Sequence, residues 1–414
     1  MAFFKHLLNH LLRSNGKEEA PPPRIFAYCA SNIGMGHYVR LVRVLREYIR
    51  RRPQTSVLMA TDARELSIAA DACIATLRLP GYCFNGDGKF SQSPEHLSIT
   101  NDELHNLRER LLMAAADEFR PDLVIMDSLP HGKRNEMAGV LRSAREAGAR
   151  SILIMRDIPS LPGDTFKLSG PADKIEREAE LYDSILIAGD KGLFDAARTF
   201  QWPPAVREKL QYIGFVLPPA ETASRAEAFA MFGHGLDSAK PTIVASLGGG
   251  WSGEEAIERL LDGALKARER LKRPVQMILF TGPAVKEEQL ESVRRRATAA
   301  GGVIIERFTN RFAPILAHSD LAILQAGSTV YQVLEGSKPL ILLCRKYKSR
   351  EQDERARRLA HLPGVRVVES DDFETTDLGE LIGWGLAQKH APRKTGFSYD
   401  GPARAAAAID RLLK

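Results

Sequence analysis

Short apolar runs of strand length alternate with segments of helical periodicity along most of the chain. In the helical segments apolar residues recur at every third or fourth position, whereas the runs between them are continuously apolar. This alternation predicts an α/β fold built from doubly wound parallel sheets. The predicted strands are residues 24–30, 56–60, 74–79, 123–126, 151–155, 184–188, 242–247, 276–280, 303–306, 321–324 and 340–343.

The alternation falls into two series, because 414 residues are too many for one hydrophobic core. Residues 218–240 hold two adjacent prolines and little strand character, and we interpret them as a linker. The linker joins two Rossmann-like domains, residues 24–217 and 241–392, which we expect to face each other across a cleft. Residues 1–23 form an amphipathic segment with its own linker. Residues 393–414 form a C-terminal helix that we expect to pack back on the first domain.

The turn between the strand at 321–324 and the helix that follows it is the strongest candidate for ligand binding. Gly327, Ser328 and Thr329 are small or carry hydroxyls, and the N-terminus of the next helix would direct N–H groups and its positive end at them. Such a turn is suited to a phosphate. The alternative is structural: Thr329 and Gln332 have the spacing of a capping box and would then only satisfy helix-end amides.

A similar strand–turn–helix unit opens the first domain. Gly34 and Gly36 permit a tight turn, and His37 follows them at the start of a helix that runs to about Arg52. The turn lies beyond the carboxyl end of a strand, where open α/β sheets bind ligands. We therefore favour a functional role for His37 over a structural one.

Other polar residues follow predicted strands of the first domain on the same side of the sheet. The acceptor-side candidates are Asp127, His131, Arg156 and Asp157. Taken singly, each is better explained as a helix cap, a loop hydrogen bond or a surface ion pair. Two long loops on this side, residues 80–96 and 156–171, are rich in Gly and Pro.

Arginines recur along one side of the helix that follows His37, at Arg40, Arg43, Arg46 and Arg50. A solvated helix face explains this series best. Contact with anionic lipid is the alternative.

A glycine run, Gly248, Gly249 and Gly250, follows the first strand of the second domain. Glu254 and Glu255 in the first turn of the next helix already occupy its positive end and would repel a pyrophosphate. We therefore assign these glycines to close backbone approach near a ligand, and the phosphates to the later turn.

Composition narrows the function. Hydrophobic residues make up 44% and charged residues 27%, as in a globular protein, and the net charge is +6. The basic residues are interspersed with 52 acids and form no aromatic-interleaved stripe, which argues against nucleic acid as a partner. Four scattered cysteines without a CxxC pair favour a reducing compartment and argue against structural zinc.

The N-terminal residues 2–13 carry one apolar face, although no run in the chain approaches the roughly 20 apolar residues of a membrane span. Three roles stay open for this segment: peripheral contact with a membrane interface, a docking helix, or a disordered tail. We expect a cytoplasmic location, with any membrane contact at the inner face.

Taken in order and spacing, the motifs resemble those of the GT-B glycosyltransferases of the MurG type. They are IGMGH at 33–37, SLGGG at 246–250, Phe308-Thr309 ahead of a helix that ends HSD at 318–320, AGST at 326–329, GSKP at 336–339, and Glu351-Gln352. The resemblance covers most of the chain from Arg24 on and is strongest from Thr242 to Leu362.

The resemblance implies a nucleotide-sugar donor in the second domain, most often a UDP-sugar such as UDP-N-acetylglucosamine. Phe308 and Thr309 would lie by the base, residues 327–329 by the diphosphate and Gln352 by the sugar. The first domain would take the acceptor, which stays open between a lipid-linked molecule and a saccharide. His37 would lie in the cleft as a base candidate or a phosphate contact.

One position departs from the family pattern. The family usually has Glu where this chain has Gln332, and that Glu holds the ribose hydroxyls. Gln still forms hydrogen bonds with a hydroxyl, but it removes a charge and can donate.

The chemistry of sugar transfer points the same way. Negative charge on the leaving phosphates needs stabilisation, and the chain has no DxD motif of the kind that holds a metal for this purpose. A helix N-terminus with hydroxyls does the same work without a metal, and an imidazole near its ordinary pKa suits a general base. We predict a metal-independent, inverting glycosyltransferase of the hexosyltransferase type, with no cofactor.

Two other functions stay open. The segment from Ile33 to Arg40 is similar to the GxGHxxR opening of the UDP-sugar hydrolases of nonulosonic acid synthesis, in which the His would activate water. Gln332 and the amphipathic N-terminus also fit a non-catalytic, nucleotide-sugar-binding partner subunit. A dehydrogenase is disfavoured, because no third glycine and no ribose-binding acid stand at the required spacings.

Overall fold

The computed structural model describes residues 21–31, 35–84, 92–159, 161, 168, 171–248, 253–282, 285, 287–344, 350–388 and 395–414. The amphipathic segment 2–13 and the predicted site residues Gly34, Gly249 and Gly250 lie outside this part of the chain.

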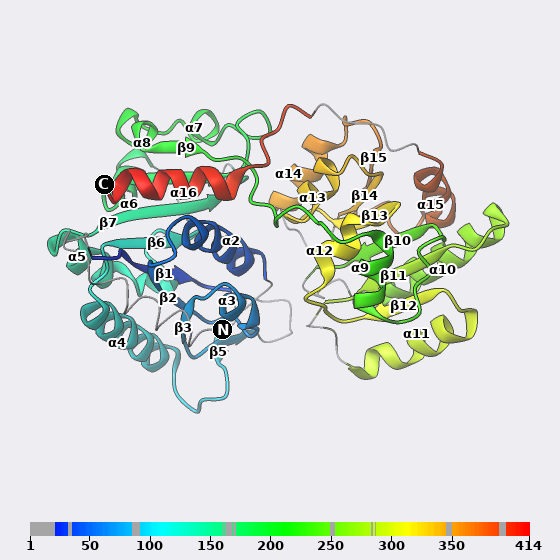
Figure 1. Cartoon of the computed structure of the whole chain (residues 1–414), viewed down its shortest axis with the longest axis horizontal. Coiled ribbons are helices and arrows are strands. Elements are labelled where there is room, and N and C mark those ends of the chain that lie inside the picture. The colour runs from blue at the N-terminus through cyan, green and yellow to red at the C-terminus, as the bar shows by residue number, and fades with distance from the viewer. Residues whose placement is uncertain are drawn as a thin grey trace, which may run out of the picture.

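The first lobe is built on a parallel seven-stranded sheet in the order β3-β2-β1-β6-β7-β8-β9 (Figure 1). Its strands are β1 (Arg24–Cys29), β2 (Ser56–Thr61), β3 (Ala75–Arg78), β6 (Leu123–Asp127), β7 (Arg150–Arg156), β8 (Ser184–Ala188) and β9 (Leu210–Tyr212). One face of the sheet is covered by α2 (Gly36–Arg51), α3 (Ser67–Asp71) and α16 (Gly401–Leu412). The other face carries α4 (Asn101–Phe119), α5 (Ala138–Glu146), α6 (Ala172–Glu180), α7 (Ala196–Thr199) and α8 (Pro204–Glu208).

The second lobe lies beside the first and holds a parallel six-stranded sheet in the order β12-β11-β10-β13-β14-β15 (Figure 1). Its strands are β10 (Thr242–Ser246), β11 (Gln276–Phe280), β12 (Val303–Glu306), β13 (Leu321–Gln325), β14 (Leu340–Leu343) and β15 (Val365–Val368). Helices α10 (Gly253–Leu271), α11 (Glu287–Ala300) and α15 (Leu378–Ala387) pack on one face. Helices α12 (Phe312–Ala317), α13 (Val330–Glu335) and α14 (Arg350–Leu359) pack on the other.

The sequence pattern explains why these runs become central strands. Every residue of β6, β8, β11 and β13 is buried, as expected where helices cover both faces of a parallel sheet. The predicted fold class, two doubly wound α/β domains, is therefore confirmed. The start of α4 also forms as expected, because Thr100 and Glu103 complete a capping box.

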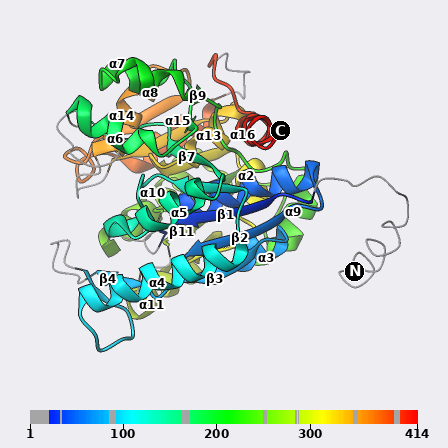
Figure 2. The same cartoon turned by 90° about the vertical axis from the view of Figure 1, so that its left-hand side faces the viewer.

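The last helix returns to the first lobe, where α16 packs along α2 (Figures 1 and 2). Ala405 and Ile409 are fully buried in the same core cluster as Leu41 and Leu45 of α2. Gly401 allows this crossing, because a Cβ placed there would lie 2.6 Å from the carbonyl oxygen of Phe215. The chain thus crosses between the lobes twice, once after Phe215 and again before Gly401, and the two crossings lie side by side.

Several elements differ from the sequence expectation. The loop predicted at 80–96 contains two short paired strands, β4 (Tyr82–Phe84) and β5 (Gln92–Pro94). The predicted linker 218–240 contains α9 (Arg225–Phe232), whose capping box at Ser224 and Glu227 begins a helix that packs on α12. The short edge strands β9 and β15 were not predicted, because neither is a continuous apolar run.

Candidate functional site

The strand order of each sheet reverses once, and both reversals lie at the junction of the lobes. In the first lobe the reversal falls between β1 and β6, and in the second between β10 and β13. Open parallel sheets bind ligands at such switch points, outside the carboxyl ends of the strands. A Cβ built on Gly36, after β1, would lie 3.9 Å from Oγ of Ser328, after β13. The two switch points therefore face each other.

His37 and Asp127 meet across the switch point of the first lobe. His37 is the second residue of α2 and Asp127 is the last residue of β6, and Nδ1 lies 2.6 Å from Oδ1. The Asp127 side chain is fully buried. An ionised carboxylate only accepts hydrogen bonds, so we assign the proton of the neutral imidazole to Nδ1. This leaves the lone pair on Nε2.

Arg40 fixes the other side of the Asp127 carboxylate. Its Nε lies 3.0 Å from Oδ2 and its Nη2 lies 2.7 Å from Oδ1. The Arg40 side chain is only 11% exposed. Arg43 is likewise half-buried and donates to the carbonyl oxygen of Val216 at 3.2 Å. The prediction of a solvated face was therefore wrong for Arg40 and Arg43, because this side of α2 faces β6 and the interlobe connection, the segment of residues 214–217 that leaves the first lobe after β9.

Ser128 completes the surroundings of the imidazole. Its Oγ lies 3.0 Å from Nδ1 of His37 and accepts from Nη2 of Arg40 at 3.1 Å. Ser128 adopts a φ of 65°, the left-handed region that a residue with a Cβ seldom occupies. Backbone strain of this kind tends to gather at functional sites.

The Arg156 guanidinium donates a hydrogen bond to Nε2 of His37, the imidazole nitrogen that is not bound to Asp127. Its Nη2 lies 2.6 Å from Nε2 of His37, and its Nη1 forms an ion pair with Glu351 in α14 of the second lobe. Arg156 ends β7, the neighbour of β6 in the sheet. The guanidinium thus joins the imidazole of one lobe to a carboxylate of the other.

These neighbours give His37 an unusual pKa. Burial and the positive charge of Arg156 lower the pKa of His37 to about 4, against the opposing effect of Asp127. The imidazole is consequently neutral at pH 7. From the sequence we expected an ordinary imidazole pKa, because neither the burial of the ring nor the charge of Arg156 beside it can be read from local pattern.

Asp157 lies next to Arg156, but its carboxylate serves the contact between the lobes. Nε of Arg355 lies 2.7 Å from Oδ2 and Nη2 lies 2.8 Å from Oδ1, while the hydroxyl of Tyr331 donates to the same carboxylate. All three side chains are buried. Asp157 therefore forms an ion pair, but a buried one between the lobes rather than the surface ion pair considered for it.

His131 takes no part in the group around His37. Burial, together with the charges of Arg142 in α5 and Lys174 in α6, lowers the pKa of His131.

The turn after β13 lies open at the junction of the lobes. Ser328 is exposed, and Gly327 and Thr329 are half-buried. The amide of Gly327 donates to Gln325, and α13 is short, with its first amides bonded back to the carbonyls of residues 327–329. Within the described part of the chain, the amides of Ser328 and Thr329 have no hydrogen-bond partner. These two amides and their hydroxyls are the donors that the turn offers.

Thr329 does not cap the helix with its side chain. It adopts helical dihedral angles, and its hydroxyl makes no capping bond to α13. The capping-box alternative for Thr329 and Gln332 is therefore wrong, and both side chains remain half-buried at the turn.

The remaining donor-side residues lie on the loops and the helix that surround this turn. Phe308 follows β12 and is 44% exposed, which is high for a phenylalanine, and Thr309 follows it. Gly248 follows β10 with a φ of 64°. Gln352 lies in the first turn of α14, and its Oε1 is buried without a hydrogen-bond partner in the described residues.

Sequence reasoning missed four residues of this site: Arg40, Ser128, Tyr331 and Arg355. A signal existed for Arg40, because residues three apart lie on one helix face and Arg40 therefore points the same way as His37. No local pattern marks Tyr331 or Arg355, since their partner Asp157 belongs to the other lobe.

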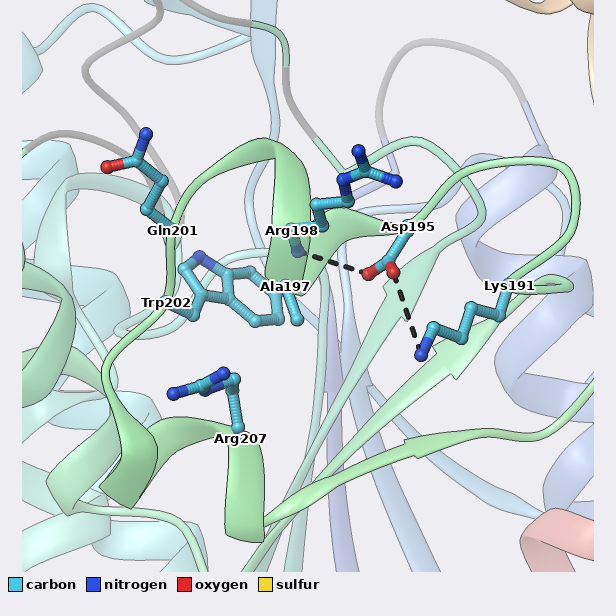
Figure 3. A pocket seen from close by; sticks show the side chains of 7 residues that line it. All are labelled: Lys191, Asp195, Ala197, Arg198, Gln201, Trp202 and Arg207. Carbon is cyan, nitrogen blue, oxygen red and sulfur yellow. Dashed lines mark hydrogen bonds and ion pairs between the residues drawn. The ribbon is translucent and has the colours of Figure 1, made fainter.

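A pocket of about 410 Å³ lies elsewhere in the first lobe (Figure 3). It is lined by Lys191, Asp195, Ala197, Arg198, Gln201, Trp202 and Arg207. Lys191 and the backbone of Arg198 both turn toward the carboxylate of Asp195 in Figure 3. No site residue predicted from the sequence lines this pocket.

Comparison with known protein families finds a match in the second lobe. Residues 244–398 match the glycosyltransferase family 28 C-terminal domain. The second lobe is therefore similar to the C-terminal domain of glycosyltransferase family 28. The turn after β13, Phe308 and Gln352 all lie within the matched residues, whereas His37, Asp127 and Arg156 belong to the first lobe, which the match does not reach.

Solved structures with the same two-lobed fold cover nearly the whole chain. MurG of Acinetobacter baumannii is 13% identical with a TM-score of 0.55, over 94% of this chain and 100% of that one. A glycotransferase of kitacinnamycin is 14% identical with a TM-score of 0.59, over 95% and 100%. UDP-GlcNAc 2-epimerase of Methanocaldococcus jannaschii is 12% identical with a TM-score of 0.61, over 94% and 99%. These likenesses establish the GT-B fold.

No curated protein sequence matches the chain. Among the helices that the structure describes, none is both long and apolar enough to cross a membrane. The described residues also contain no group of three or more His, Cys, Asp or Glu side chains arranged to hold a metal ion.

Proposed function

We propose that the chain is a metal-independent, inverting glycosyltransferase of the hexosyltransferase type. It moves a sugar from a UDP-sugar, such as UDP-N-acetylglucosamine, to a hydroxyl acceptor. The observation that carries the proposal is the placement of the His37–Asp127 pair opposite the Ser328 turn of a lobe similar to the family 28 C-terminal domain. A base on one lobe and an anion-binding turn on the other are the two parts that the reaction needs.

The donor occupies the second lobe. The exposed ring of Phe308 offers a surface on which a base stacks, and Gln332 takes the ribose. The hydroxyls and amides of Ser328 and Thr329 hold the diphosphate. Gln352 binds the sugar, because a sugar hydroxyl that donates to its Oε1 satisfies a buried acceptor that otherwise has no partner.

His37 is the general base toward the acceptor. Its Nε2 takes the proton of the acceptor hydroxyl while the hydroxyl oxygen bonds to the anomeric carbon. The bond from that carbon to the phosphate oxygen breaks, and the nucleoside diphosphate leaves with the electron pair. Asp127 holds the tautomer with Nδ1 protonated and stabilises the imidazolium that forms. Attack from the face opposite to the leaving group inverts the anomeric centre.

The charge that develops on the leaving diphosphate is met by the second lobe. Donors arranged in advance around a water-poor junction stabilise such charge strongly, without a metal ion. The amides of Ser328 and Thr329 supply this stabilisation together with their hydroxyls. Arg156 adds a positive charge at the junction of the two lobes.

The acceptor belongs to the first lobe, and its class stays between a lipid-linked molecule and a saccharide. The β4–β5 pair lies within the loop at 80–96, which follows strand β3 of the first lobe. We place the enzyme in the cytoplasm, with residues 2–13 as the contact of an inner-membrane location if the acceptor is lipid-linked.

A panel of UDP-, GDP-, ADP- and dTDP-sugars tests the proposal by thermal shift in a chelating buffer. We expect one base class, UDP, to raise the Tm, since a ligand that binds only the native state stabilises it. His37→Ala should keep this shift and lose transfer. Unchanged turnover in that variant would remove His37 from the mechanism.

Turnover assays with the donor that binds, run with and without an acceptor, separate the proposal from its alternatives. The similarity of the opening motif to UDP-sugar hydrolases makes hydrolysis the nearest competitor. Release of sugar without an acceptor, at a rate comparable to transfer, would favour the hydrolase. Binding without any turnover would favour a non-catalytic partner subunit.

A further inference from the structure

The Arg156 guanidinium contacts one residue of each lobe. One nitrogen of its guanidinium lies 2.6 Å from Nε2 of His37, and another is paired with Glu351. A guanidinium only donates hydrogen bonds, so Nε2 accepts and its lone pair is in use. In this arrangement the imidazole cannot take a proton from an acceptor. The residue that ends β7 therefore occupies the atom that the proposed reaction needs.

Arg156 shares its surroundings with two other cations, which compete with it for the nearby carboxylates. Three cations, Arg40, Arg156 and Arg355, lie among the carboxylates of Asp127, Asp157 and Glu351. Asp127 is bound to Arg40 and Asp157 to Arg355, so among the described residues the direct ion pair of Arg156 is with Glu351.

The titration behaviour of Arg156 agrees with this geometry. Burial, together with the like charges of Arg40 and Arg355, lowers the pKa of Arg156 to about 10. A cation in such a place is stabilised by any further anion that comes within reach.

An anion at the Ser328 turn would come within reach. Gly36 precedes His37, and the turn lies directly across from it. The Arg156 side chain is 20% exposed at the junction of the lobes, and guanidinium groups bind phosphates in a bidentate manner. A diphosphate at Ser328 and Thr329 thus competes with His37 and Glu351 for the same guanidinium.

We propose that Arg156 is a positioning residue that covers Nε2 of His37 until an anionic diphosphate draws its guanidinium away. Donor binding then uncovers the base and releases Glu351 in one movement. The covered base cannot activate water or an acceptor before the donor is in place. The displacement half of this inference rests on the proposed function, whereas the covering of Nε2 does not.

The test follows the His37 imidazole by NMR in the full chain labelled with ¹⁵N-histidine. The chain has 10 histidines, and loss of one signal in His37→Gln identifies the resonance. In the wild type we expect the pKa of His37 near 4. Arg156→Gln should raise it by about one unit, because a neighbouring like charge is removed. Arg150→Gln, at the exposed opposite end of β7, should leave it unchanged.

Arg156→Lys separates charge from packing. The lysine keeps the positive charge, so we expect a smaller rise in the His37 pKa than in Arg156→Gln. An equal rise in both variants would overturn the proposal, because the effect would then come from lost packing. No rise in a folded Arg156→Gln protein would overturn it as well.

Nucleotide addition tests the displacement. Saturating UDP should raise the His37 pKa of the wild type more than that of Arg156→Gln, since only the wild type has a guanidinium to move. Inorganic pyrophosphate should act like UDP and uridine should not, because the phosphates are the attracting group. A UDP that binds, by thermal shift, without this difference would overturn the displacement.

Failure of the proposed function gives a different pattern. If no nucleotide binds, that function and the donor-driven displacement fall together. The comparison of Arg156→Gln with Arg156→Lys needs no nucleotide and still decides whether Arg156 covers the base.

Discussion

Oδ2 of Asp157 lies 2.7 Å from Nε of Arg355, which joins the end of β7 in one lobe to α14 in the other through a buried ion pair. Tyr331 donates to the same carboxylate, and its ring stacks on Phe215 of the interlobe connection with centroids 3.5 Å apart. The buried pair fixes how the lobes meet, and hence how the Ser328 turn faces Gly36.

Removing the charge of Asp157 should therefore destabilise the protein strongly. Asp157→Asn leaves the Arg355 cation buried without its counter-charge, which costs about 3–5 kcal/mol. Urea unfolding measures the change. Arg150→Gln breaks the exposed pair with Asp183 and should cost at most about 1 kcal/mol. Equal, small losses in both variants would show that the buried pair does not hold the lobes.

The stability of the protein should fall in two steps on acidification. His37 has a folded pKa of about 4, below its unfolded value of about 6.5, so the unfolded state binds the proton first. Stability is full above pH 6.5 and falls by about 2–3 kcal/mol as the pH drops to 4. Asp127 and Asp157, whose folded pKa values are lowered, lose their contribution only below their unfolded value of about 3.9.

His37→Gln should remove the upper step and keep the lower one. Urea unfolding at a series of pH values between about 2 and 7.5 measures both steps. A variant that follows the wild type across the whole range would contradict the assignment of the upper step to His37.

The hydroxyls of the turn after β13 should matter for donor binding and little for folding. Replacing Ser328 and Thr329 together with alanine removes two donors to a charged group, and we expect at least about a tenfold loss of UDP affinity. Neither hydroxyl caps α13, so the Tm without nucleotide should change little. Ser370→Ala, at a half-buried position of the same lobe where the hydroxyl donates to the neighbouring Asp371, serves as the control in calorimetric titration. Unaltered affinity in the double variant would place the diphosphate elsewhere.

Replacing Gln352 should raise the stability of the protein and weaken the binding of the sugar. Its buried Oε1 has no partner in the described residues, so Gln352→Met removes an unsatisfied polar atom and should stabilise the protein by about 1 kcal/mol. The same change should weaken binding of the UDP-sugar more than binding of UDP, because only the sugar would donate to this oxygen. Equal losses for both ligands would remove Gln352 from the sugar subsite.

The pattern of the sequence predicted the two-domain architecture because repeated apolar runs report burial directly. It also placed His37 and Asp127 on one side of a sheet, since both follow strands. It did not predict α9 within residues 218–240. A capping box and one short helix give a weaker sequence signal than the two prolines and mixed charge, which indicate a linker.

The contacts that define the site depend on distances that no local pattern encodes. Arg40 reads as one of a solvated series until β6 brings Asp127 beside it. Asp157 and Arg355 are 198 positions apart, and their pairing exists only once the lobes meet. The low pKa of His37 follows from burial and from the charge of Arg156, which is 119 positions away.

The most direct measurement is a calorimetric titration of the full chain with UDP-N-acetylglucosamine in a chelating buffer. The account predicts saturable binding at one site per chain, weakened at least about tenfold in the Ser328→Ala, Thr329→Ala double variant and preserved in His37→Ala. Absence of saturable binding for this donor and for every other UDP-sugar, with the protein folded, would contradict it.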